Sequence, residues 1–104
     1  MVKRLTDENF KQEISNGFSL VVFTAPWCPT CERQAPVIDE LDSEVGKLIT
    51  VCRLNTDENP ETSKEFSIMS IPTLILLKDG KKVERLIGFH NKEELIGMLG
   101  KYLD

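Results

Sequence analysis

The chain has 104 residues with a formal net charge of −4, and 40% of its residues are hydrophobic. This length and composition can fill one core, so we expect a single domain over residues 1–104. The acidic balance, without any basic block, argues against a nucleic-acid partner and gives no reason to expect binding to anionic membranes. We expect a cytoplasmic protein, because no stretch has the roughly 18 apolar residues of a membrane span and the N-terminus lacks the apolar core of a signal peptide.

Strand and helix patterns alternate along the chain. A short first helix is expected to begin at Thr6, to place Phe10 and Ile14 on one face and to end at Gly17. Consecutive apolar residues from Phe18 to Thr24 then predict a central strand that is covered on both faces. This strand points directly at a pair of cysteines.

A longer helix is expected from Cys28 to about Val45, because Gly46 can end it there. Its buried face is expected to carry four apolar side chains, those of Ala35, Ile38, Leu41 and Val45. Pro36 lies inside this helix and removes the hydrogen bond to the Glu32 carbonyl, so a kink is expected there.

A second buried strand is expected over residues 48–54. It is followed by a short helix that Asn59 can cap and that Pro60 opens.

The last part of the chain predicts a hairpin and a closing helix. Apolar runs at residues 73–77 and 83–87 flank Asp79 and Gly80, a pair that is typical of an antiparallel turn. The final helix is expected to start from a cap at Asn91. Its inward-facing residues are expected to be Leu95, Ile96, Leu99, Tyr102 and Leu103. This order of elements predicts an α/β fold in which helices sandwich a mixed sheet.

The strongest chemical pattern is Trp-Cys-Pro-Thr-Cys, from Trp27 to Cys31. Residues three apart on a helix lie about 5–6 Å from each other, which suits the Cα separation of about 4.4–6.8 Å in a disulfide. Free N–H groups and the positive end of the helix dipole favour a thiolate at the helix start. Cys28 is therefore the candidate nucleophile and Cys31 the candidate resolving cysteine of a redox disulfide.

A Cys-x-x-Cys pair can also be half of a zinc or iron–sulfur site. Such sites need about four ligands, and the chain offers only Cys52 and His90 as further soft ligands. We therefore favour redox chemistry without a metal or organic cofactor. Cys52 is expected to be an inert, buried residue of a strand, and His90 a solvated loop histidine.

Several short motifs together point to one known family. They are the run from Trp27 to Cys31 after Phe23, then Pro36, the stretch from Leu54 to Pro60, Ile71-Pro72-Thr73, Lys78-Asp79-Gly80 and Gly88. With these motifs the chain resembles the thioredoxin family over nearly its whole length. The resemblance implies the thioredoxin fold, a five-stranded mixed β-sheet flanked by four α-helices, and a protein-disulfide reductase activity. It also implies a cis peptide bond before Pro72.

The resemblance further implies a substrate site, because in the family the cis-proline loop faces the cysteines and receives the substrate backbone. An apolar rim is expected to hold an extended peptide here, formed by Trp27, Ile71, Pro72, Gly88 and Phe89. The expected partners are protein disulfides and an electron donor of the thioredoxin-reductase type. Whether that donor is a flavoprotein, a ferredoxin-linked enzyme or glutathione stays open. We expect the chain to act as a monomer.

The residues between the cysteines depart from the family pattern, which is usually Gly-Pro and here is Pro29 and Thr30. Pro29 lacks an N–H that could face the Cys28 sulfur, and the N–H of Thr30 is expected to hold the thiolate instead. Glutaredoxins share a proline in the first position, so a more oxidising glutaredoxin-like or isomerase-like enzyme is one alternative. The other is a non-catalytic module that binds proteins through the same rim.

A second departure is Val22, which stands six residues before Cys28, where thioredoxins usually have a buried aspartate. In the family that carboxylate helps to deprotonate the resolving cysteine. The usual nearby lysine is replaced by Arg53, which cannot act as a base. Removal of the proton from Cys31 is therefore expected to fall to water or to another group.

Overall fold

The computed structural model describes residues 1–103. Within this range it has five strands: β1 (Lys3–Leu5), β2 (Phe18–Thr24), β3 (Thr50–Asn55), β4 (Thr73–Lys78) and β5 (Lys81–Ile87). They form one sheet in the order β1-β3-β2-β4-β5. β3 lies parallel to both β1 and β2, whereas β4 is antiparallel to β2 and β5, so the sheet is mixed as expected.

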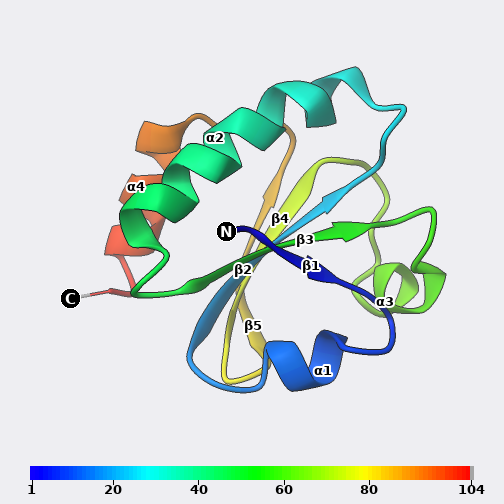
Figure 1. Cartoon of the computed structure of the whole chain (residues 1–104), viewed down its shortest axis with the longest axis horizontal. Coiled ribbons are helices and arrows are strands. Elements are labelled where there is room, and N and C mark those ends of the chain that lie inside the picture. The colour runs from blue at the N-terminus through cyan, green and yellow to red at the C-terminus, as the bar shows by residue number, and fades with distance from the viewer. Residues whose placement is uncertain (104) are drawn as a thin grey trace.

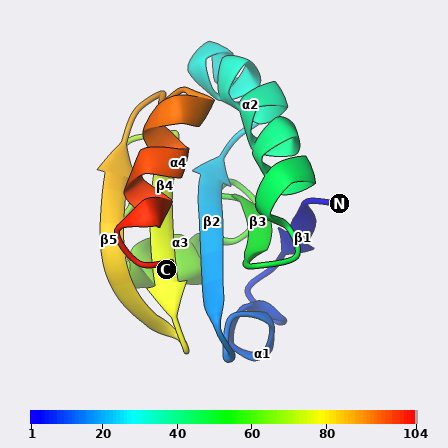
Figure 2. The ribbon, with the colours of Figure 1, turned by 90° about the vertical axis from the view of Figure 1, so that its left-hand side faces the viewer.

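Helices cover both faces of this sheet. In the described part of the chain there are four: α1 (Phe10–Glu13), α2 (Pro29–Val45), α3 (Pro60–Glu65) and α4 (Lys92–Gly100). α2 and α4 lie on one face, and α1 and α3 lie on the other (Figure 1 and Figure 2). The arrangement is the one that the family resemblance implied. None of the helices between residues 1 and 103 is both long and apolar enough to cross a membrane.

The central strand β2 contributes side chains to two hydrophobic clusters, one on each face of the sheet. Leu20 and Val22 point into the cluster under α2 and α4, while Val21 and Phe23 point into the cluster on the side of α1. Successive side chains of a strand point to opposite faces, so an uninterrupted apolar run is what a strand between two helical layers requires. The prediction of a strand covered on both faces is confirmed.

Two strand predictions were incomplete. β1 has three residues, of which Lys3 and Arg4 are exposed. It therefore has no apolar run from which the sequence could predict a strand. The strand expected over residues 48–54 begins later, at Thr50, because Leu48 lies in a turn in which its N–H donates to the Val45 carbonyl at 2.8 Å. Leu48 is 68% exposed, so its expected burial is wrong.

The buried faces of the two long helices also differ in part from expectation. In α2, Ile38 and Leu41 are buried as expected, but Ala35 is exposed and the polar Gln34 is buried in its place. In α4, Leu95 and Leu99 are buried, whereas Ile96 is 40% exposed. Met98 takes the buried position instead, and Tyr102 and Leu103 lie beyond the helix end, packed against the same core.

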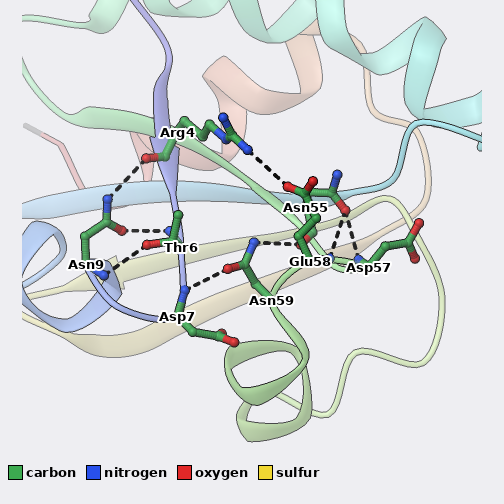
Figure 3. Close-up of polar contacts among 8 residues, drawn as sticks. All are labelled: Arg4, Thr6, Asp7, Asn9, Asn55, Asp57, Glu58 and Asn59. Carbon is green, nitrogen blue, oxygen red and sulfur yellow. Dashed lines mark hydrogen bonds and ion pairs between the residues drawn. The ribbon is translucent and has the colours of Figure 1, made fainter.

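The prediction that Asn59 caps α3 is wrong. Asn59 does not cap α3 with its side chain. The Asp7 carboxylate does so from the other end of the sequence, accepting hydrogen bonds from the N–H groups of Glu61 at 3.2 Å and Thr62 at 2.8 Å. The Asn59 side chain instead accepts from the Asp7 N–H and donates to the Asn55 carbonyl (Figure 3). A cap from a distant residue cannot be read from local spacing.

The hairpin turn and the cap of α4 are confirmed, whereas α1 covers only Phe10–Glu13 and is shorter at both ends than the helix expected from Thr6 to Gly17. Asp79 and Gly80 have positive φ angles of 49° and 84° and connect β4 to β5. Asn91 caps α4 by accepting from the Glu94 N–H at 2.8 Å, and the Glu94 carboxylate accepts from the Asn91 N–H at 2.9 Å. This reciprocal capping box fixes where α4 begins, directly after the loop that follows β5.

Candidate active site

The cysteine pair lies where the central strand β2 passes into α2. Cys28 is the N-cap residue of α2, and its Sγ accepts a hydrogen bond from the Cys31 N–H at 3.2 Å. The expected donor was Thr30, so that detail is wrong: Thr30 follows Pro29 in the first turn, and the N–H that reaches the sulfur is the one three residues after the cap. Both cysteines are free thiols and nearly buried, with 5% and 4% exposure.

The loop before β4 faces Cys28. The peptide bond between Ile71 and Pro72 is cis, as the resemblance implied. The Cys28 thiol donates to the Ile71 carbonyl at 3.8 Å, and the Gly88 N–H donates to the Pro72 carbonyl at 2.8 Å. The structure therefore brings Ile71, Pro72 and Gly88, from two separate loops, to one side of the cysteine pair.

Trp27 lies beside the pair with 67% of its surface exposed. Its indole Nε1–H donates to the Asp57 carboxylate at 2.8 Å. Asp57 follows β3 in a turn that Asn55 holds by accepting from the N–H groups of Asp57 and Glu58 (Figure 3). Asp57 was not among the predicted site residues, although it belongs to one of the motifs that carry the family resemblance.

Two side chains of α2 contact the part of the rim that contains Phe89. The Arg33 guanidinium stacks over the Phe89 ring, with its carbon 5.0 Å from the ring centre. The Gln34 side chain donates to the His90 carbonyl at 2.9 Å and accepts from the His90 N–H at 2.8 Å. Neither Arg33 nor Gln34 was predicted to belong to the site, because nothing local in the sequence relates α2 to the loop after β5.

The two remaining candidates have different outcomes. Cys52 lies in β3 with 0% exposure, as expected, and burial raises the pKa of its thiol to about 12. His90 lies in a loop, as expected, but it is half-buried and its Nδ1 is 2.9 Å from the Gly88 carbonyl, so it is less solvated than expected. Among residues 1–103, no group of three or more His, Cys, Asp or Glu side chains is placed to hold a metal ion.

Comparison with known proteins gives one result. The family model for thioredoxin matches residues 1–101. The chain is 47% identical over 103 residues to the thioredoxin of Listeria monocytogenes, covering 99% of this chain and 100% of that protein. It is 44% identical over 102 residues to the thioredoxin of Bacillus subtilis and 48% identical over 100 residues to that of Alicyclobacillus acidocaldarius, covering at least 95% of both chains in each case. The chain belongs to the thioredoxin family. It is a thiol–disulfide oxidoreductase with a Cys-x-x-Cys pair, and it reduces protein disulfides.

The surroundings of Cys31 combine apolar and polar groups. A cavity of about 60 Å³ adjoins Cys31 and is lined by apolar side chains, among them Val22, and by Thr24, Asp39 and Arg53. Burial raises the pKa of the Cys31 thiol, and the hydrogen bond with Cys28 raises it further, while the hydroxyl of Thr24 and the backbone of Ala25 act in the opposite direction. Val22, one of the β2 side chains that line this cavity, can neither accept nor donate a proton.

Proposed function

We propose that Cys28 is the nucleophile of the reaction and Cys31 the residue that resolves it. The observation that carries this proposal is the place of the Cys28 sulfur, which caps α2 and accepts the Cys31 N–H at 3.2 Å. Such a donor and the positive end of a 17-residue helix stabilise a negative sulfur. Pro29 and Thr30 hold this turn, because proline at the first helical position fixes the backbone without losing a needed N–H.

The reaction consists of two thiol–disulfide exchanges. The Cys28 thiolate attacks one sulfur of a substrate disulfide, a Cys28–substrate disulfide forms, and the other substrate sulfur leaves as a thiolate that takes up a proton. Cys31 then loses its proton and attacks the Cys28 sulfur. A Cys28–Cys31 disulfide forms and the second substrate sulfur leaves, so the substrate gains two electrons and the pair is oxidised.

The substrate is proposed to lie across the rim of Trp27, Ile71, Pro72, Gly88 and Phe89. Support comes from the backbone of the cis-proline loop, which reaches Cys28 through the Ile71 carbonyl. An extended peptide can pair with such a loop through its main chain, so binding makes few demands on the substrate's side chains. Broad selection of protein disulfides follows.

The cellular setting is part of the same proposal. We place the chain in the cytoplasm as a single domain and a monomer, with its oxidised pair reduced again by a thioredoxin-reductase-type donor. The relatives carry the name thioredoxin, which supports disulfide substrates and such a donor. Equilibration with glutathione would give the reduction potential and would separate this reductase from the more oxidising enzyme suggested by Pro29 and Thr30.

The test compares two serine variants in the reduction of insulin by dithiothreitol. Cys28→Ser should abolish the reaction and form no mixed disulfide, because the attacking sulfur is gone. Cys31→Ser, reduced and then freed of dithiothreitol before insulin is added, should accumulate a Cys28–insulin disulfide that mass spectrometry detects. Accumulation in Cys28→Ser, or its absence in both variants, would reverse or remove the assignment.

A further inference from the structure

Gln34 is a buried polar residue on the inner face of α2. Its side chain is 1% exposed, and it lies between Cys31 and Ile38 along the face where every other fully buried position is apolar or a cysteine. Both of its polar atoms are bonded to the backbone of one residue, the His90 N–H at 2.8 Å and the His90 carbonyl at 2.9 Å. One amide therefore satisfies two backbone groups of the loop after β5.

The bonds of Gln34 close a ring of contacts around the proposed substrate rim. His90 joins Gly88 through its Nδ1, 2.9 Å from the Gly88 carbonyl. Gly88 joins Pro72 through an N–H···O bond of 2.8 Å, and the Ile71 carbonyl accepts from the Cys28 thiol at 3.8 Å. Cys28 is the N-cap residue of α2, the helix that carries Gln34. Without Gln34, the described hydrogen bonds would leave this ring open on the side of α2.

From this ring we propose that Gln34 is a positioning residue for substrate binding, which fixes the Gly88–Phe89–His90 loop at the distance from Cys28 that an extended protein substrate requires. The inference rests on the proposed function of the rim. Gln34 itself does not touch the reacting sulfurs. It acts through the loop, so it affects substrates that lie along the rim and not those that reach only Cys28.

Gln34 serves the fold by satisfying two backbone groups of the loop, and the same two hydrogen bonds fix where that loop lies. A buried amide gains nothing from the hydrophobic effect, and an apolar side chain of similar size would fit the core face of α2 without polar atoms to satisfy. What an apolar side chain cannot do is hold both the donor and the acceptor of one loop residue. The neighbouring Arg33 acts on the same loop, because its guanidinium stacks over Phe89.

The main test is Gln34→Met, which keeps the length of the side chain and removes both hydrogen bonds. The matched control is Gln12→Met, at an exposed glutamine of α1. We expect KM for insulin to rise about tenfold in Gln34→Met, with kcat nearly unchanged. Without the two hydrogen bonds, the loop after β5 is no longer fixed before the substrate binds, and ordering it on binding costs affinity. The rate with a small aromatic disulfide and the rate of Cys28 alkylation should equal those of the wild type and of the control.

Gln34→Glu supplies a rescue that a merely structural role would not show. A neutral carboxyl can donate its O–H to the His90 carbonyl and accept from the His90 N–H, whereas a carboxylate can only accept. Burial raises the pKa of such a carboxyl, so the neutral form persists above the usual range. KM for insulin should therefore lie near the wild-type value at pH 5.5 and approach that of Gln34→Met by pH 8. Wild type measured at each pH is the reference, because the ionisable groups His90, Cys28 and Cys31 lie near this loop in both proteins.

Parallel measurement of Trp27→Ala separates this inference from the proposed function. If Trp27→Ala raises KM for insulin and Gln34→Met does not, the rim binds substrate but Gln34 does not position it. If neither variant changes KM, the rim itself is not the substrate site. Equal slowing of insulin and of the small disulfide in Gln34→Met would also overturn the proposal, because it would show damage to the cysteines instead of loss of the loop.

Discussion

Buried thiols lie both at the start of α2 and in the interior of β3, but the groups around the thiols differ between these two places. Cys28, Cys31 and Cys52 are exposed by only 5%, 4% and 0%. At the start of α2, the sulfur of Cys28 meets an N–H donor and that of Cys31 meets a hydroxyl. In β3, Cys52 lies in a cluster of aliphatic and aromatic side chains. Exposure alone therefore does not distinguish a redox thiol from a structural one.

The neighbours of each sulfur decide what burial does to it. Burial raises the pKa of Cys52 to about 12, and the charge of Lys3 offsets only part of that effect. Burial also raises the pKa of Cys31, but there the Thr24 hydroxyl and the Ala25 backbone work against it. The first N–H groups of a helix have no partner within the helix, so they can bind a sulfur that lies there. Inside a strand, the backbone N–H and C=O groups are already paired with neighbouring strands.

The largest expected difference between the two regions is in alkylation. At pH 7, a thiol with a pKa of about 12 has about a thousandth of the thiolate of one with the ordinary value of 9.0. Iodoacetamide should therefore modify Cys28 first and Cys31 second, with Cys52 at least about a thousandfold slower than an exposed cysteine. Peptide mass mapping over time on the reduced protein gives the three rates.

Two outcomes would break the comparison. Faster alkylation of Cys31 than of Cys28 near neutral pH would contradict the assigned roles. Modification of Cys52 at the rate of the pair would show that β3 opens readily, because a side chain with 0% exposure has no access to the reagent in the folded state.

This comparison also shows which features the sequence could predict. The central strand β2, the hairpin at Asp79 and Gly80, and the long helix after the cysteines all follow from patterns within a few residues. β1 was missed because three residues are too few to show the alternation of apolar and polar side chains that is typical of a strand. It is recognised only from the pairing of Leu5 with Leu54 in β3. Likewise, the Asp7 cap of α3 joins residues more than 50 positions apart.

The site divides in the same way. Cys28 and Cys31 are adjacent on one helix turn, so their spacing predicts their contact. Gln34 and His90 meet only because α2 and the loop after β5 lie at the same end of the sheet, 56 positions apart in the chain. A buried glutamine has no local signature, since helical periodicity at that position would predict an apolar residue.

The next prediction introduces a carboxyl group beside Cys31, through Val22→Asp. Val22 is 5% exposed and lines the cavity next to the Cys31 thiol. Burying an acid there should lower the free energy of unfolding by about 2–5 kcal/mol. Burial raises the pKa of the new carboxyl in the folded state, so stability is greatest at low pH and is lost as pH rises through that value. Urea melts at pH 5 and pH 8 measure this.

The same variant should speed resolution of the mixed disulfide above pH 7 by at least about tenfold, because the new carboxylate can accept the Cys31 proton. Stopped-flow fluorescence of Trp27 with a model disulfide follows that step. An unchanged melt together with a flat resolution rate from pH 6 to 9 would mean that Val22 does not occupy the position of the family's acid.

A smaller effect is expected from Thr24→Val, which removes a hydroxyl without changing the shape of the side chain. The Thr24 hydroxyl lowers the pKa of Cys31, so its loss should raise that pKa further. Resolution should slow about threefold at pH 7 and recover at higher pH, while the first attack by Cys28 stays unchanged. Thr56→Val is the matched control, because the Thr56 hydroxyl donates to the Thr24 carbonyl. Equal slowing in both variants would show a general loosening of the site.

The smallest effect on activity is expected from Cys52→Ala. Reduction of insulin should stay within about twofold of wild type, because a neutral, enclosed thiol takes no part in exchange. Loss of the sulfur from the core should cost about 1 kcal/mol of unfolding free energy near pH 7. Since the folded pKa of about 12 lies above the ordinary 9.0, the thiol stabilises the fold below pH 9 and loses that contribution as pH rises toward 12. The difference in stability between wild type and Cys52→Ala, measured in urea at pH 7, 9 and 10.5, should therefore shrink with pH, and a constant difference would show that Cys52 ionises as readily folded as unfolded.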